Sequence, residues 1–172
     1  MNSTLGLRGC ATALVAGALA LSAMHSAARA EGLVSTKRLS ASLAAEAVAA
    51  AVTACAQKNF FVGAVVLDYS GVQQATLRGD GAGGQNILNA YDKAFTAATF
   101  ATDTADLVER SRTGTVSSSF AKVPHLLLAA GGVVIKVGDE VIGAIGVSGA
   151  PGGDNDAACA KAAIEKIKDK MK

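Results

Sequence analysis

Histidine is scarce in this sequence of 172 residues, which contains only His25 and His125. A histidine metal cage needs several imidazoles, and a serine-type triad needs one that is matched to a nucleophile and an acid. The sequence also lacks a cluster of convergent general acids and bases. These shortages exclude a histidine-based metal cage, argue against a serine-type triad, and make a binding function a better prediction than an enzymatic one.

Long apolar runs are also missing, because no segment after residue 30 offers the roughly 20 apolar residues that a membrane-spanning helix needs. Residues 1–30 have the pattern of a secretory signal peptide. Arg8 supplies a basic start, residues 10–23 form a short apolar core, and residues 28–30 (ARA) form a small-x-small cleavage site. We predict cleavage after Ala30 and a periplasmic or secreted protein. The alternative, an uncleaved N-terminal anchor, is disfavoured by the short apolar core.

Residues 31–172, the predicted mature chain, have no excess of charge. Arg8 and Arg29 account for the difference between the 16 basic and 14 acidic residues of the whole chain. The one basic run, in residues 166–172, lies at the end of a predicted helix, where lysines interact favourably with the helix dipole. We therefore predict no nucleic-acid partner. The length of the mature chain is typical of one domain.

Cysteine occurs three times, and only Cys55 and Cys159 remain after residue 30. Export would place them where disulfides persist. Both cysteines fall in predicted helices, and if these helices pack side by side the cysteines can bridge, so we predict a Cys55–Cys159 disulfide. The alternative is two buried free thiols. Their wide spacing argues against a Cys-x-x-Cys redox or zinc motif.

Hydrophobic periodicity predicts helices that alternate with β-hairpins. We expect helices at 40–59, 85–100, 155–171 and, after a cap at Thr102 or Thr104, up to about Ser111. We expect strands at 60–67, 72–78, 126–130, 133–137 and 141–147. This order predicts an α+β fold with a five-stranded, mostly antiparallel sheet covered by helices.

Two loops precede predicted helices. Asp154 and Asp156 follow the glycine-rich loop 149–153, where acidic side chains commonly cap a helix and complement its dipole. Residues 79–84 form a second glycine-rich loop, but it lacks the Lys-Ser/Thr of a phosphate-binding loop. We interpret it as a flexible connection that needs positive φ angles, and it could also border a pocket.

Four segments together resemble a known family. They are VVLDYSG at 65–71, TLRGDGAGG at 76–84, KAFTA at 93–97, and a Val-Pro pair at 123–124 followed by GAIGVSGAPGG at 143–153. In this order they resemble the GlcG/HbpS family of haem-binding or haem-degrading domains. The resemblance implies a profilin-like fold, self-assembly into dimers or larger oligomers, and binding of haem or a related tetrapyrrole.

The resemblance also suggests binding residues. His125 follows Pro124 where the family pattern more often has glycine, and imidazole is a common axial ligand of haem iron; the alternative is an exposed loop histidine. Lys93, in the KAFTA segment, could pair with a haem propionate, with Asp106 or with another local acid. Arg78 could reach an anionic ligand or form a structural pair with Asp80. Tyr91 could pack in the core or contact haem.

We therefore predict an exported homo-oligomer that binds haem through an apolar pocket, with Lys93, Arg78 or both near the propionates and His125 as a candidate iron ligand. Residues 85–91 carry no acid and no histidine, which argues against direct binding of free iron ions. The alternative is a non-catalytic accessory or structural partner of a periplasmic oxidoreductase or of a small-molecule catabolic system.

Overall fold

The computed structural model describes residues 32–171 of the chain, and residues 35–171 form its folded unit. The predicted signal peptide lies outside the described residues. The helices are α1 (Ala41–Ala56), α2 (Gly84–Phe100), α3 (Thr104–Arg112) and α4 (Gly153–Ile167), with short 3-10 helices at Ser118–Lys122 and Lys168–Lys170. The strands are β1 (Gly63–Asp68), β2 (Gln73–Arg78), β3 (Gly132–Val137) and β4 (Glu140–Ser148). No helix in the described part of the chain combines the length and apolar character needed to cross a membrane.

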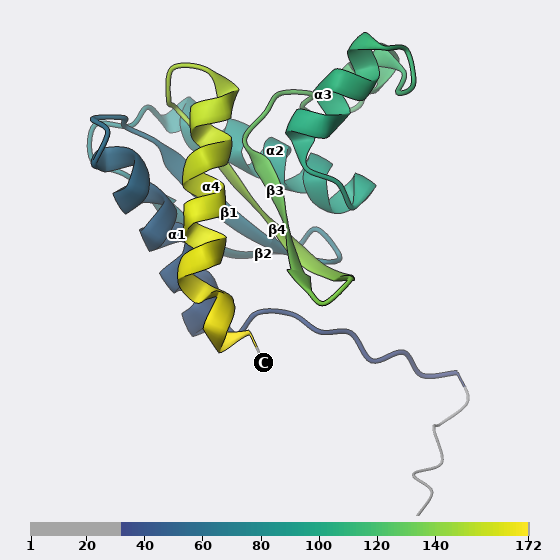
Figure 1. Ribbon diagram of the computed structural model, residues 1–172, viewed down its shortest axis with the longest axis horizontal. Coiled ribbons are helices and arrows are strands. Elements are labelled where there is room, and N and C mark those ends of the chain that lie inside the picture. The colour runs from purple at the N-terminus through teal and green to yellow at the C-terminus, as the bar shows by residue number, and fades with distance from the viewer. Residues whose placement is uncertain (1–31, 172) are drawn as a thin grey trace, which may run out of the picture. The chain divides into compact units, whose positions relative to one another are not determined.

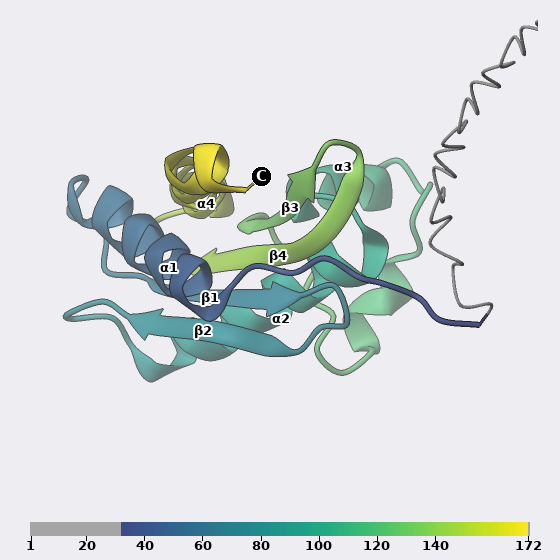
Figure 2. The same ribbon diagram turned by 90° about the horizontal axis from the view of Figure 1, so that it is seen from below.

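The sheet has the strand order β2-β1-β4-β3, and each neighbouring pair is antiparallel (Figure 1). Helices α1 and α4 cover one face and α2 covers the other, as Figure 2 shows. The alternation of β1 explains these layers, because successive side chains of a strand point to opposite faces. Ala64 and Val66 join the core under α1 and α4, whereas Val65 and Leu67 join the core under α2.

The prediction of five strands was wrong, because residues 126–130 form no strand. The backbone of this segment makes hydrogen bonds outside the sheet. The Leu127 amide donates to the Thr96 hydroxyl, and the Ala129 amide donates to the Leu127 carbonyl. The outer edge of β3 is partly taken by side chains. The Val134 amide donates to Asp103 Oδ1 at 3.0 Å. Side chains therefore occupy positions where a fifth strand would pair.

The junction between α2 and α3 supplies the groups that bond this edge. Asp103 is the N-cap residue of α3, so the expected cap at Thr102 or Thr104 was wrong. Thr104 is buried, and its hydroxyl accepts a hydrogen bond from the Gly132 amide at 2.9 Å. Asp103 and Thr104 thus accept hydrogen bonds from backbone amides at the edge of β3. This leaves fewer unpaired backbone donors and acceptors that could pair with another strand.

The disulfide between Cys55 and Cys159 is present and joins α1 to α4, with the two Cα atoms 5.6 Å apart. Both cysteines are buried. The alanine-rich faces of α1 and α4 bring the two helices into direct contact. The expectation that these helices pack side by side is therefore confirmed, as is the pairing.

Helix α2 lies unusually close to the sheet, and glycines on the strands permit this approach. A Cβ atom at Gly146 of β4 would overlap the Ala90 carbonyl oxygen, and one at Gly132 of β3 would overlap the Lys93 carbonyl oxygen. Glycine is needed at both positions because no other residue leaves room for the α2 backbone. This contact determines where the side chains of α2 emerge.

Candidate functional site

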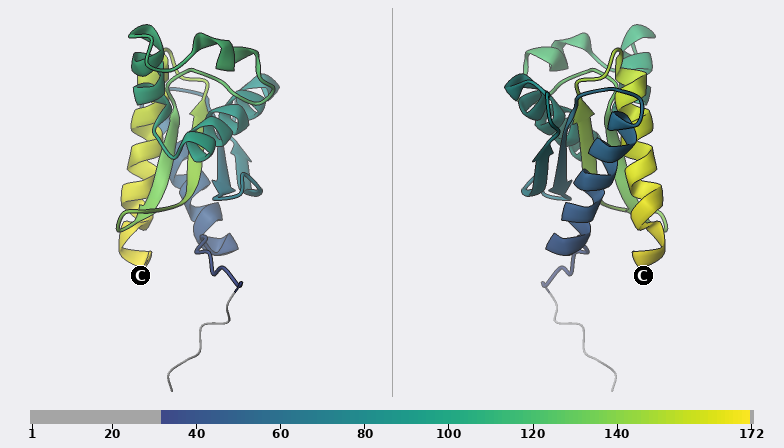
Figure 3. Two further views of the ribbon diagram at one scale, coloured as in Figure 1. Left: turned by 90° about the vertical axis from the view of Figure 1, so that its right-hand side faces the viewer. Right: turned by 90° about the vertical axis from the view of Figure 1, so that its left-hand side faces the viewer.

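Helix α2 and the segment 123–130 that lies against it form the centre of the candidate site (Figure 3). The Thr96 hydroxyl connects them. It accepts a hydrogen bond from the Leu127 amide and donates one to the Asp92 carbonyl, each at 2.7 Å. Because a helix turns by about 100° per residue, neighbouring residues of α2 point in different directions. Asp92 and Lys93 consequently belong to two separate groups of side chains.

The first group surrounds His125. Its Nδ1 atom lies 3.0 Å from Asp92 Oδ1. The ring meets Tyr91 and Phe95 edge-on, with centroids 5.6 and 6.2 Å away. The His125 side chain is 63% exposed and the Asp92 side chain 30% exposed. The structure thus presents an accessible imidazole that is held by a carboxylate and two aromatic rings.

The backbone of His125 has a φ angle of 64°. Such left-handed conformations are uncommon for residues other than glycine, although histidine is enriched among the exceptions. Glycine would adopt this conformation without strain. The turn therefore explains why glycine suits this position, and histidine adds an imidazole side chain to it.

The second group is a buried ion pair between Lys93 and Asp156. Lys93 Nζ donates to Asp156 Oδ2 at 2.7 Å and to the Val147 carbonyl at 3.1 Å. Asp156 Oδ1 accepts the Ala150 amide at 2.9 Å. The side chains are only 6% and 4% exposed. The pair links α2 to the end of β4 and to the start of α4. The acid that partners Lys93 is therefore Asp156.

Burial raises the pKa of Asp156 above its ordinary value, while the hydrogen bonds from Lys93 and from the Ala150 amide, together with the positive charge of Lys93, act in the lowering direction. Burial disfavours the charged carboxylate because it removes water. Lys93 and the loop amide offset only part of this cost. Asp156 lies in the first turns of α4, and it serves as the structural partner of Lys93 and of the loop before that helix.

We compare the free energy of unfolding of the wild type with that of Asp156→Asn. Relative to this variant, we expect the wild type to lose stability as the pH rises from 3.8, the ordinary pKa of aspartate, through the raised pKa of folded Asp156. In this window the folded state binds the proton more tightly than the unfolded state, so the contribution of Asp156 is fully present below 3.8 and is lost as the pH rises. Denaturant unfolding of both proteins between pH 3 and 7 measures the difference. A difference that grows with pH would show that the ion pair outweighs burial.

A cleft of about 530 Å³ borders this ion pair. Its walls are the segment 127–130, the loop 148–153 before α4, and residues from α2, α3 and α4, namely Asn89, Lys93, Val108, Asp154 and Asp156. Asp154 is exposed in the first turn of α4, whose N-cap is Gly152, and no side-chain hydrogen bond caps the helix. The predicted cap at Asp154 was therefore wrong in detail, although its charge does lie at the helix start.

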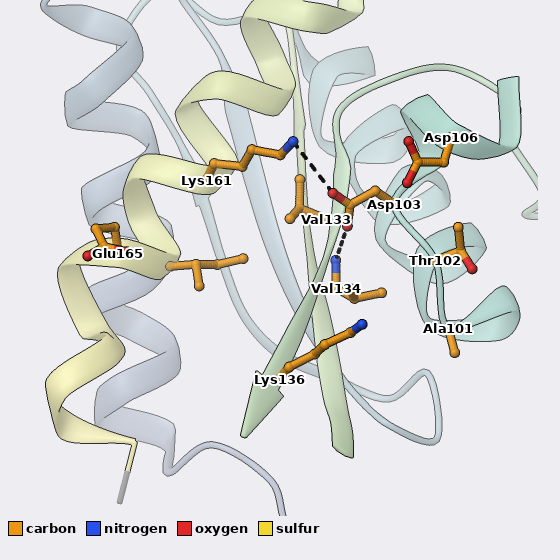
Figure 4. Close-up of a pocket in the computed structure, with 10 residues that line it drawn as sticks. Ala101, Thr102, Asp103, Asp106, Val133, Val134, Lys136, Lys161 and Glu165 are labelled. Carbon is orange, nitrogen blue, oxygen red and sulfur yellow. Dashed lines mark hydrogen bonds and ion pairs between the residues drawn. The ribbon is translucent and has the colours of Figure 1, made fainter. Parts of the chain in front are cut away.

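A second cavity of about 580 Å³ lies beside the edge of β3 (Figure 4). Asp103 lies at its centre, with Oδ2 3.7 Å from Lys161 Nζ and Oδ1 bonded to the Val134 amide. Lys136, Asp106 and Glu165 add charges of both signs to its lining. None of the predicted site residues lies here.

Arg78 and Tyr91 both make structural contacts, although both also remain at least partly accessible to solvent. Arg78 Nη1 donates to the Ala82 carbonyl at 3.0 Å and so closes the glycine-rich loop after β2. None of the ion pairs in residues 32–171 joins Arg78 to Asp80. Tyr91 is half-buried and packs on the core that contains Val65. The structure therefore brings Tyr91 to His125, whereas Lys93 is bound to Asp156 in the buried ion pair.

Asp92 is the site residue that sequence reasoning missed. Residues 85–91 contain no acid, and Asp92 is the next residue. Its position immediately before Lys93 of the KAFTA segment was the only available signal. Its partner, His125, lies 33 residues away along the chain, so no local spacing indicated the contact. Within the described residues, no three His, Cys, Asp or Glu side chains gather as a metal site.

Comparisons with known proteins agree with this architecture. The family model described as haem degrading protein HbpS-like matches residues 39–165. A crystal structure of HbpS is 34% identical, with a TM-score of 0.75, and the match covers 81% of this chain and 97% of that one. A double mutant of Streptomyces reticuli HbpS is 33% identical, with a TM-score of 0.74, 92% of this chain covered and 99% of that one.

A complex of PduOC with heme is also similar, at 25% identity and a TM-score of 0.70, covering 76% of this chain and 96% of that one. Among curated proteins, none matches the chain.

Proposed function

Because the chain belongs to the HbpS-like family of haem-degrading proteins, we propose that it is an exported, oligomeric protein that binds haem or a related tetrapyrrole. The observation that carries this proposal is His125, an exposed imidazole bound by Asp92 and packed against two neighbouring aromatic rings. The similarity to a PduOC complex with heme supports the choice of ligand. Histidine is a common axial ligand of haem iron.

The side chains around His125 supply groups that a haem site uses. The Nδ1 atom is engaged by Asp92, which leaves Nε2 as the ring nitrogen for iron. Tyr91 and Phe95 offer apolar ring surface next to the imidazole, and burial of apolar surface supplies much of the affinity of small-molecule sites. When bound, haem supplies an iron centre that accepts an axial nitrogen ligand.

The propionates need a cationic or polar partner. Lys93 is a weaker candidate than the sequence suggested, because its ammonium is buried and bonded to Asp156 and to the Val147 carbonyl. Arg78 is exposed and uses Nη1 for the Ala82 carbonyl. We therefore retain Arg78 as the cation proposed to meet a propionate.

Export is proposed on two grounds. Residues 1–30 carry the predicted signal peptide, and the Cys55–Cys159 disulfide is of a kind that persists in oxidising compartments. Self-assembly is proposed from the family resemblance. Light scattering of the purified protein tests it, and a monomer at micromolar concentration would contradict it.

Titration of the full chain with haemin tests the proposed ligand. We expect a saturable shift of the Soret band that is altered, with weaker binding, in His125→Ala, because the axial nitrogen is lost. Glu109→Ala, which removes an exposed carboxylate on α3, is the control variant and should leave the shift unchanged.

Two other results of this titration would argue against the proposal. A spectrum identical in wild type and His125→Ala would remove His125 from the site. A shift no larger than that of an unrelated control protein would favour the accessory role beside a periplasmic oxidoreductase. Recovery of only the protein itself from a periplasmic pull-down would in turn count against that role.

A further inference from the structure

The geometry points to Asp92 as a positioning residue that sets the tautomer of His125 and directs its Nε2 lone pair outward. This inference deepens the proposed function and rests on it for the identity of the ligand. The contact itself is a property of the chain without any ligand. It can therefore be tested independently of haem binding.

The chemistry of the Asp92–His125 pair selects one tautomer of the ring. An ionised carboxylate only accepts hydrogen bonds. Asp92 Oδ1 lies 3.0 Å from His125 Nδ1, so in the neutral ring Nδ1 carries the hydrogen and Nε2 carries the lone pair. The bond made by one ring nitrogen determines which nitrogen is free to bind a metal. Carboxylates that orient metal-binding histidines in this way also raise the basicity of the ligand.

One turn of α2 holds both Asp92 and the segment that carries His125. The Thr96 hydroxyl donates to the Asp92 carbonyl and accepts from the Leu127 amide, which lies two residues after His125. The backbone that carries the imidazole and the backbone that carries the carboxylate are therefore both bonded to one hydroxyl. This arrangement limits the relative movement of the two side chains.

The imidazole ring is also held by aromatic contacts. Tyr91 and Phe95 are one turn apart on α2, stack on each other, and both make T-shaped contacts with the imidazole. Asp92 contacts one ring nitrogen at the same time. A merely exposed loop histidine would not need three contacts from one helix. An imidazole held in this way loses less conformational freedom when it binds a ligand.

Nitrogen-15 NMR of the full chain without haem tests the tautomer. His125 signals are assigned by their loss in His125→Ala, since His25 is the only other histidine. At pH 8.5 we expect the wild type to be predominantly the Nδ1–H tautomer. In Asp92→Ala we expect the Nε2–H form to increase. Glu109→Ala, which removes an exposed helical carboxylate on α3, is the matched control and should keep the wild-type populations.

The haemin titration supplies the second measurement. Loss of an outer carboxylate typically weakens metal binding by 10–100-fold, so we expect Asp92→Ala to bind haemin roughly 10-fold more weakly. A predominantly Nε2–H ring in the wild type would overturn the inference, and this result does not depend on the folding of any variant. Unchanged tautomer populations in a folded Asp92→Ala protein would also overturn it. If haemin fails to bind while the tautomer responds, the proposed ligand is wrong and the positioning role stands.

Discussion

Replacing Lys93 with methionine should lower the free energy of unfolding by about 3–5 kcal/mol, the usual cost of removing one partner from a buried ion pair. The ammonium of Lys93 makes two hydrogen bonds, to Asp156 and to the Val147 carbonyl. Without it, a carboxylate that is 4% exposed has lost its charged partner. Denaturant unfolding at neutral pH measures the change.

Two variants separate the loss of the pair from the loss of a lysine. Lys161→Met is the matched control, because the Lys161 side chain is 62% exposed and its contact with Asp103 spans 3.7 Å; surface pairs of this kind contribute about 0–1 kcal/mol. The double variant Lys93→Met with Asp156→Leu should recover much of the stability, since apolar replacements of buried pairs are often neutral. A loss below about 1 kcal/mol in the single variant would contradict the ion-pair account.

The double variant Cys55→Ala with Cys159→Ala should lose about 4–5 kcal/mol of stability. The bridge spans a sequence separation of 104 residues, and cross-linking a loop of this length removes much of the conformational entropy of the unfolded chain. The alanines preserve the apolar character of these buried positions. Thermal or denaturant unfolding of the variant and the oxidised wild type measures the loss.

A thiol count provides the control for the disulfide. The protein cleaved after Ala30, denatured without a reductant, should show no free thiol, because Cys55 and Cys159 are bonded to each other. Reduction should then lower the stability of the wild type toward that of the alanine variant. Two free thiols in the unreduced protein, or equal stabilities with and without the bridge, would contradict this prediction.

The helices and hairpins of the fold were predictable because their signals are local. The alanine-rich sequence of α1 and the glycines before α4 each act within a few residues. The error at residues 126–130 has a different origin. An apolar run predicts a strand only if a sheet edge is free, and here Asp103 and Thr104 bond the edge of β3 from the start of α3.

The sequence by itself determined the four helices, the two hairpins, the family resemblance, the candidate ligand His125 and the pair of cysteines, because these depend on residue type and short spacing. Only the tertiary structure decided which charges meet. Lys93 lies 63 residues from Asp156, and Asp92 lies 33 residues from His125. The close contact of α2 with the glycines of β3 and β4 directs Lys93 toward the start of α4, and the Thr96 hydroxyl holds the 123–130 segment against Asp92. Partners at such separations depend on packing, which no local pattern encodes.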